Sequence, residues 1–234
     1  SLLFCITIFQ SSADARYASI VIDERTGKVL HASNPDRQRY PASLTKMMTL
    51  YMVFDALNRG KLKLNQRLRV SRRAQGMAPS KLGLKRGQSI TVKDAILALI
   101  TKSANDVAVV VAESLGKTEI NFAKMMTRKA RSLGMRKTRF RNASGLPNRR
   151  QVSTARDMAT LARKLITDFP QFYHLFKTQR FSYKRRTYRN HNRLLRAYPG
   201  VDGIKTGYIR ASGFNLVAST KRYGRRLIGV VFGG

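Results

Sequence analysis

Apolar and polar positions follow one pattern at the two ends of the chain and another in the middle. Two short apolar runs, 17–23 and 29–32, flank a turn that contains Gly27, which predicts a β-hairpin. Helical spacing bounded by capping residues, glycine or proline then recurs over 43–58, 91–100, 106–115, 118–133 and 154–169. Strand patterns return over 180–188, 201–209, 213–219 and 226–232, and the last two flank a hairpin turn at 221–225.

Strands at both ends and helices between them predict an α+β fold. We expect a catalytic domain over 16–234, with a sheet built from 16–40 and 180–234 and a helical lobe of about 57–169 inserted between its strands. Residues 1–15 are set apart as the remainder of an export signal, because a short apolar run ends in Ala13-Asp14-Ala15. A buried N-terminal strand is the alternative for this run, which is too short to span a bilayer.

The charge of the chain is strongly positive. Lys and Arg number 46 against 12 Asp and Glu, a formal net charge of +34, so we expect an anionic partner: nucleic acid, anionic lipid or an acidic polymer. Hydrophobic residues make up 43% of the chain, which excludes a disordered polycation. Cys5 is the single cysteine and the three histidines are scattered, so the sequence excludes an internal disulfide and a Cys/His zinc cluster.

The helix predicted over 43–58 carries an unusual lysine. Its positions are apolar nearly all round, which is typical of a buried helix, and Lys46 is one of two charged residues in it. Ser43 lies one turn earlier on the same face, at the helix start, where free N–H groups favour negative charge. A serine beside a desolvated amine is a candidate nucleophile. Taken singly, the serine also fits a simple N-cap and the lysine a solvent-reaching side chain.

Three short motifs follow one another along the chain. They are Ser43-Leu-Thr-Lys46, Ser103-Ala-Asn105 between two predicted helices, and Lys205-Thr-Gly207 on a predicted strand. The first pattern is weak alone, since it recurs at Ser114-Leu-Gly-Lys117, and the third is the rarest by chance. The order and placement of the three carry the information.

Together these motifs resemble the active-site set of penicillin-binding proteins and serine β-lactamases. Further segments narrow the resemblance to the low-molecular-mass D-alanyl-D-alanine carboxypeptidases, over about 17–234: Tyr40-Pro-Ala-Ser-Leu-Thr-Lys-Met, Asn142-Ala-Ser-Gly-Leu-Pro147, Ser153-Thr-Ala-Arg-Asp157 and Val201-Asp-Gly-Ile-Lys-Thr-Gly207. The resemblance implies a β-lactamase/transpeptidase-like α+β fold, an antiparallel sheet flanked by helices with an inserted helical lobe.

The resemblance also implies a reaction. A serine hydrolase of this kind removes the terminal D-alanine from peptidoglycan stem peptides through an acyl-enzyme on Ser43. Lys46 would accept the proton of Ser43, Ser103 would pass a proton to the leaving nitrogen, and the N–H groups of Ser43 and Tyr208 would form the oxyanion hole. The resemblance implies that the substrate is contacted by Asn105, Lys205, Thr206, Gly207 and Tyr208. It implies a reaction that needs no metal and no cofactor.

The same resemblance implies the partners and the compartment. The substrate is a peptidoglycan stem peptide, β-lactams are covalent inhibitors, and the protein is exported to the periplasm or the outer face of the cytoplasmic membrane. The positive charge then suits an anionic membrane or wall surface. We expect no specific nucleic acid, since the sequence has no helix-turn-helix, zinc finger or aromatic-flanked RNA motif.

Several alternatives remain open at this point. A class A β-lactamase uses a Glu for deacylation, but Glu113 and Glu119, the glutamates between Ser103 and Lys205, lie in no E-x-x-L-N pattern. A D,D-endopeptidase or a penicillin-binding protein with little turnover would use the same residues. A basic polymer-binding protein with a dead site is the alternative from another class.

The chain departs from the family pattern in two places. The segment Asn148-Arg149-Arg150 is unusually basic. Thr127 stands where the family commonly has Asn, from which we expect the loss of a local hydrogen bond.

Overall fold

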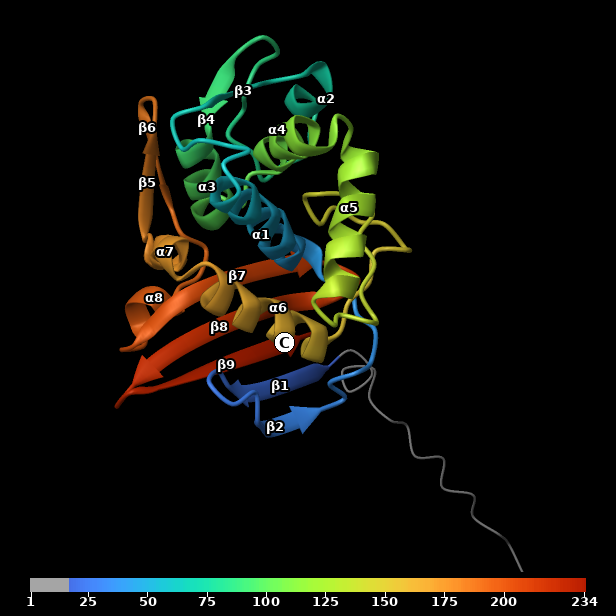
Figure 1. Ribbon diagram of the computed structural model, residues 1–234, viewed down its shortest axis with the longest axis vertical. Helices are drawn as coiled ribbons and strands as arrows, with labels where there is room; N and C mark the ends of the chain where they lie inside the picture. The colour runs from blue at the N-terminus through green and yellow to red at the C-terminus, as the bar shows by residue number, and fades with distance from the viewer. Residues whose placement is uncertain (1–16) are drawn as a thin grey trace, which may run out of the picture.

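The main sheet is assembled from both ends of the chain. In the computed structural model, which describes residues 17–234, the sheet is antiparallel with the strand order β2-β1-β9-β8-β7 (Figure 1). Its strands are β1 (Ala18–Asp23), β2 (Val29–Ser33), β7 (Val201–Ile209), β8 (Gly213–Arg222) and β9 (Arg225–Phe232). β1 pairs with β9 over the whole length of β1, so early and late segments of the chain hold each other in place. The predicted α+β class is confirmed, whereas the predicted export signal lies outside the described residues.

One face of the sheet packs on a helix. Alternate residues of β9 are buried, among them Ile228 and Val230, as expected for a strand with one covered face. In β1, every residue except Val21 is buried. Helix α6 (Ala155–Asp168) lies across this face and packs against both strands (Figure 1). The sequence placed α6 within the inserted helical lobe, but its packing partner is the sheet.

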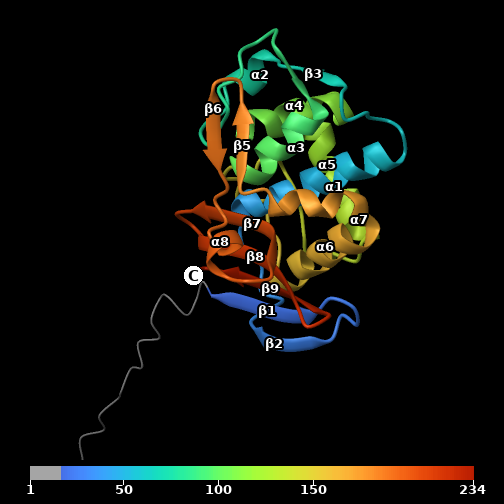
Figure 2. The same cartoon turned by 90° about the vertical axis from the view of Figure 1, so that its left-hand side faces the viewer.

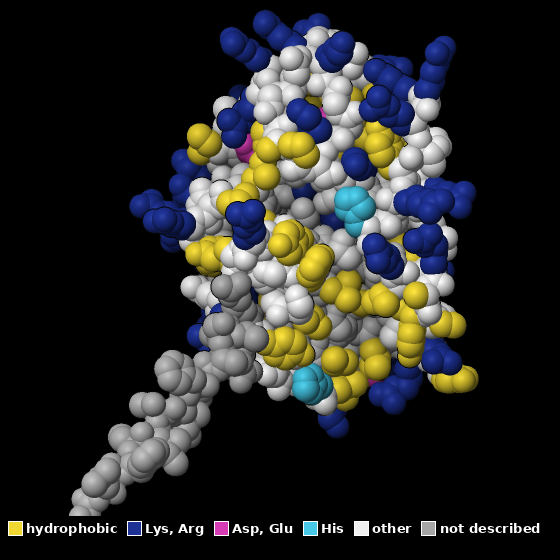
Figure 3. All heavy atoms as spheres, turned by 180° about the vertical axis from the view of Figure 1, so that it is seen from behind, with side chains coloured by type: hydrophobic (Ala, Val, Ile, Leu, Met, Phe, Trp, Pro, Cys, Tyr) yellow, Lys and Arg dark blue, Asp and Glu magenta, His cyan; other side chains and the backbone are white. Residues whose placement is uncertain are grey.

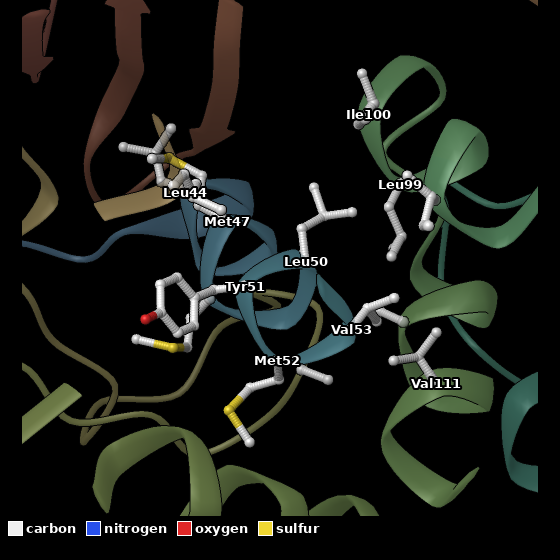
Figure 4. Close-up of a cluster of buried hydrophobic side chains, with 14 of the residues drawn as sticks. Leu44, Met47, Leu50, Tyr51, Met52, Val53, Leu99, Ile100 and Val111 are labelled. Carbon is white, nitrogen blue, oxygen red and sulfur yellow. The ribbon is translucent and has the colours of Figure 1, made fainter. Parts of the chain in front are cut away.

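A fully buried helix forms the centre of the helical part. Helix α1 (Thr45–Asn58) follows a 3₁₀ turn, Ala42–Leu44, and most of its side chains are buried. Figure 4 shows Leu50 and Val53 of α1 facing side chains of the neighbouring helices. These neighbours are α3 (Val92–Thr101), α4 (Asn105–Gly116) and α5 (Glu119–Ser132). The apolar pattern all round α1 therefore reflects packing on several sides.

Side-chain caps fix where the helices begin. Thr91, Thr118 and Thr154 accept hydrogen bonds from backbone N–H groups in the first turns of α3, α5 and α6, as their sequences predict. The remaining short elements are β3 (Arg67–Arg69), α2 (Arg72–Gln75), β4 (Ser89–Thr91), α7 (Pro170–Tyr173), a 3₁₀ turn (His174–Lys177) and α8 (Leu194–Ala197). No helix within residues 17–234 has both the length and the apolar character needed to cross a bilayer.

The segment predicted as one strand over 180–188 is a separate hairpin. It forms β5 (Arg180–Tyr183) and β6 (Arg186–Arg189), which pair with each other and stand beside the helical part (Figures 1 and 2). The prediction of one strand in the main sheet was wrong because the turn residues Lys184 and Arg185 are not the usual turn formers. Lys184 nevertheless adopts a positive φ of 52° there.

The hydrogen bond expected to be lost at position 127 is present. The Thr127 hydroxyl accepts from the N–H of Phe140 at 3.0 Å and also lies 3.2 Å from the Phe140 carbonyl oxygen. A threonine hydroxyl both donates and accepts, so it bridges α5 to the segment that follows it.

The packing around α1 generates a stability prediction. Leu50→Ala removes a fully buried side chain, and we expect it to lower the free energy of unfolding by about 2–5 kcal/mol. Leu64→Ala makes the same chemical change at a side chain that is 42% exposed, and should cost less than about 0.5 kcal/mol. Urea unfolding of the two variants tests this, and equal losses would contradict the packing described.

Candidate active site

Residues from three distant segments surround one cavity between the helical part and the sheet. The cavity has a volume of about 850 Å³. Six of the eight residues singled out in the sequence line it: Ser43, Ser103, Asn105, Thr206, Gly207 and Tyr208. The other two, Lys46 and Lys205, are 0% and 1% exposed and do not line the cavity. The structure thus brings the three motifs together.

Ser43 sits in the 3₁₀ turn that leads into α1. The residue in the N-cap position of α1 is Leu44, and no side chain caps this end. The alternative of Ser43 as a simple N-cap is therefore wrong, and its hydroxyl is left to face the cavity and Lys46.

The amine of Lys46 has three neighbours. Its Nζ donates to the Asn105 Oδ1 at 2.7 Å and to the Ser144 carbonyl oxygen at 2.5 Å, and it lies 3.2 Å from the Ser43 Oγ. The first two atoms are acceptors only. A neutral amine has two N–H donors and one lone pair, so these contacts use both donors and leave the lone pair for the Ser43 hydroxyl proton.

Burial favours the neutral form of this amine. The pKa of Lys46 lies well below its ordinary value, chiefly because the buried site strips water from the charged form and secondly because the positive charge of Lys205 repels it. The carboxylate of Asp106 acts in the opposite direction but weakly. A lysine with a lowered pKa beside a serine hydroxyl is suited to act as a general base.

Ser103 and Asn105 lie at the junction of α3 and α4. Ser103 adopts a positive φ of 57°, and its Oγ is buried without a hydrogen-bond partner among the described residues. The amide nitrogen of Asn105 donates to the Ala78 carbonyl oxygen at 2.9 Å, which directs its oxygen to Lys46. An unpartnered hydroxyl facing a cavity is suited to exchange a proton with a bound molecule.

Lys205 supplies a second buried amine from β7. Its Nζ donates to the carbonyl oxygen of Thr206 at 3.0 Å, and burial lowers its pKa to about 7. Near neutral pH a large fraction of the Lys205 amines carry a proton. An anion bound in the cavity would therefore be attracted by the positive charge of Lys205.

Two glycines let backbone segments approach Ser43. A Cβ at Gly207 would lie 3.0 Å from the backbone nitrogen of Ser43. A Cβ at Gly145 would lie 1.9 Å from the Ala42 carbonyl oxygen, and Gly145 has a φ of 88° that favours glycine. The turn that carries Ser43 is therefore packed between strand β7 and the 142–147 loop.

Two buried carboxylates hold the walls of the cavity in place. Asp106 accepts hydrogen bonds from the N–H groups of Leu82, Gly83 and Leu84, next to the cavity-lining Ser80. Glu119 accepts from the N–H of Ala143 and pairs with Arg73. Neither Glu113 nor Glu119 lines the cavity, which agrees with the absence of a β-lactamase glutamate pattern.

Sequence reasoning missed other parts of the site. It gave no role to Ser144, whose carbonyl oxygen binds Lys46, although the segment around it belongs to the resemblance. It also gave no role to a basic run on the cavity wall: Arg189, Asn190, His191, Arg193 and Arg196. Loss of water contact, then the charges of Lys205, Lys102 and Lys46, lower the pKa of His191 to about 4. Within residues 17–234, no three His, Cys, Asp or Glu side chains group as metal ligands do.

The chain is similar to proteins of one family. A family model described as D-alanyl-D-alanine carboxypeptidase, peptidase S11, matches residues 7–234. The D-alanyl-D-alanine carboxypeptidase DacF of Bacillus subtilis is 38% identical over 221 residues, which are 92% of this chain and 57% of that protein. This chain thus spans little more than half the length of that relative.

Solved structures of relatives have the same fold. Penicillin-binding protein 5 of Haemophilus influenzae superposes with a TM-score of 0.90 at 35% identity, covering 98% of this chain and 67% of that one. Penicillin-binding protein D2 of Listeria monocytogenes, in its cefotaxime-bound form, gives a TM-score of 0.83 at 30% identity, covering 93% and 89%. The expected penicillin-binding-protein fold is confirmed, and the chain belongs to the D-alanyl-D-alanine carboxypeptidase family, peptidase S11.

Proposed function

We propose that this chain is the catalytic part of a serine D-alanyl-D-alanine carboxypeptidase. Ser43 attacks the carbonyl carbon of the last peptide bond of a peptidoglycan stem peptide, D-alanine leaves, and water hydrolyses the acyl-enzyme. The observation that carries the proposal is the contact set of Lys46, in which two acceptor-only atoms leave the amine lone pair for the Ser43 hydroxyl. Family membership favours this reaction over the endopeptidase and dead-site alternatives.

The remaining residues have roles that their positions support. Ser103 has an unpartnered hydroxyl, which passes a proton to the leaving nitrogen. Asn105 binds the substrate backbone and orients Lys46. The buried cation of Lys205 and the Thr206 hydroxyl attract the terminal carboxylate. The N–H groups of Ser43 and Tyr208 stabilise the oxyanion, and Gly207 lets the turn that carries Ser43 lie close to β7.

The proposed chemistry also accounts for β-lactams as covalent inhibitors. A β-lactam would acylate Ser43, and no glutamate lines the cavity to drive its hydrolysis. The cefotaxime-bound relative from Listeria supports the same chemistry at this cavity.

The compartment and the surface partner are part of the proposal. We infer an exported protein, in the periplasm or at the outer face of the cytoplasmic membrane, where its polymeric substrate lies. The net charge of +34 supports contact with an anionic membrane or wall surface. In Figure 3, Lys and Arg side chains are spread over much of the face shown, with few Asp or Glu side chains between them.

Replacing the nucleophile tests the reaction. Ser43→Ala should lower D-alanine release from a synthetic peptide ending in Lys-D-Ala-D-Ala by about 10⁴-fold or more, because no acyl-enzyme can form. Covalent labelling by a fluorescent penicillin should disappear as well. Ser114→Ala removes the exposed serine of the second S-x-x-K match and should leave both readouts unchanged. Undiminished release from the Ser43 variant would contradict the proposal.

The two lysines predict a bell-shaped pH profile. kcat/KM should rise with pH as Lys46 loses its proton, at a pH well below the ordinary lysine value. It should fall at higher pH as Lys205, whose pKa is lowered to about 7, loses the charge that attracts the carboxylate. Lys205→Arg keeps that charge at all working pH values and should remove the descending limb. A descending limb that stays in place in this variant would assign it to another group.

Vesicle binding tests the surface proposal. The protein should bind vesicles containing phosphatidylglycerol more tightly than phosphatidylcholine vesicles, and added salt should weaken the difference, because screening shortens the reach of the surface charges. Equal and salt-independent binding to both, measured by cosedimentation, would rule the membrane partner out.

A further inference from the structure

A second cavity lies beside the candidate active site. Its volume is about 480 Å³, and it is enclosed between the 82–84 loop and the β5–β6 hairpin. The hairpin contributes two tyrosine rings and three cations: Tyr183, Tyr188, Lys184, Arg185 and Arg186. None of the roles assigned to the active site uses this cavity.

The two cavities share their walls. Pro79 and Ser80 line the active-site cavity, and the same loop continues at 82–84 along the second one. On the other side, Tyr188 lines the second cavity and the next residue, Arg189, lines the first. Tyr188 also lies near the Ser103 segment in space, because the Nζ of Lys102, the residue before Ser103, sits 5.5 Å from its ring centre. The 79–84 loop and the segment around Tyr188 and Arg189 therefore line both cavities, and a polymer bound at Ser43 has the second cavity next to it.

The lining of the second cavity selects for carboxylates. Three of its lining residues are cations, Lys184, Arg185 and Arg186, and none of the described lining residues is Asp or Glu. The flanking segments 81–88 and 180–196 hold seven further Lys and Arg residues and no Asp or Glu: Lys81, Lys85, Arg86, Arg180, Arg189, Arg193 and Arg196. The guanidinium groups of Arg185 and Arg186 are exposed and have the geometry that binds carboxylates in pairs. The half-buried tyrosine rings offer flat apolar faces for sugar rings or aliphatic stems.

Two carboxylates behind the cavity are already engaged in hydrogen bonds: Asp94 accepts from the Thr91 hydroxyl, and Asp106 is bound by the 82–84 loop. Asp106 lies behind the 82–84 loop, is 0% exposed, and has its oxygens occupied by backbone N–H groups of that loop. None of the ion pairs among residues 17–234 involves Lys184, Arg185 or Arg186. Within the described part of the chain, these three cations therefore have no acidic partner.

We propose that the second cavity binds the carboxylate-bearing wall polymer beyond the peptide bond that is cut. This inference rests on the proposed function, which supplies a polymeric, acidic substrate. The cavity holds a neighbouring acidic part of the strand through Arg185 and Arg186, while Tyr183 and Tyr188 pack against its apolar faces. The site favours polymer over short soluble peptide and takes no part in the bond-breaking step.

A charge-reversed hairpin tests the proposal. The double variant Arg185→Glu/Arg186→Glu changes two exposed side chains that have no hydrogen-bond or ion-pair partner among residues 17–234. Lys124→Glu/Arg128→Glu makes the same charge change at exposed positions of α5, on the opposite side of the molecule (Figure 1). Both variants and the native protein are compared in cosedimentation with insoluble peptidoglycan and in turnover of the short peptide.

We expect the hairpin variant to bind peptidoglycan about tenfold more weakly, with kcat/KM on the short peptide unchanged. The α5 variant should match the native protein in both assays. Equal weakening in the two variants would show a general charge effect and overturn the site. Unchanged binding of the hairpin variant to peptidoglycan would also overturn the site. The same holds for an equal loss of kcat/KM on the short peptide, or an equal loss of binding to duplex DNA or phosphatidylglycerol vesicles. Cosedimentation needs no turnover, so it decides this proposal even if the native protein released no D-alanine.

Discussion

The arrangement of the site depends on one buried amine. Lys46 reaches from α1 to Asn105 at the start of α4 and to the carbonyl oxygen of Ser144 in the 142–147 loop, with Ser43 one turn away. Three segments far apart in sequence are thus joined at a single atom with no access to water. Loss of any one partner would leave a buried polar group unsatisfied, so the same contacts that prepare the base also fix the geometry around it.

Close backbone packing also fixes the position of the turn that carries Ser43. The turn at Ala42 and Ser43 is held between two glycines: a Cβ at Gly145 would overlap the Ala42 carbonyl oxygen, and a Cβ at Gly207 would lie only 3.0 Å from the Ser43 nitrogen. This turn belongs to the helical part, whereas Gly207 belongs to the sheet. Ser43, the proposed nucleophile, therefore lies where the two parts of the fold touch, and its position relative to β7 is set by main-chain contact rather than by flexible side chains.

The sequence predicted those features that local signals encode. Capped helices such as α3 and α6 follow from their threonine caps, the strands β7 to β9 follow from apolar runs and a hairpin turn, and the motif side chains follow from their spacing. The β5–β6 hairpin was not predicted because its turn residues are Lys184 and Arg185, and neither is a glycine or an asparagine. The contact of Ser144 with Lys46 was not predicted for another reason. Ser144 binds Lys46 through its backbone carbonyl oxygen, which any residue type offers. Its role depends on tertiary placement, which no local pattern records.

The two buried lysines of the site act on each other. The charge of Lys205 is one cause of the lowered pKa of Lys46, so the cation proposed to attract the substrate carboxylate also favours the neutral form of the proposed base before substrate arrives. When a carboxylate binds next to Lys205, its negative charge offsets part of that repulsion, and the proton affinity of Lys46 rises. In the proposed reaction, substrate binding thus strengthens the base at the moment when the proton of Ser43 must be taken up, whereas in the empty site the charge of Lys205 holds the pKa of Lys46 lower.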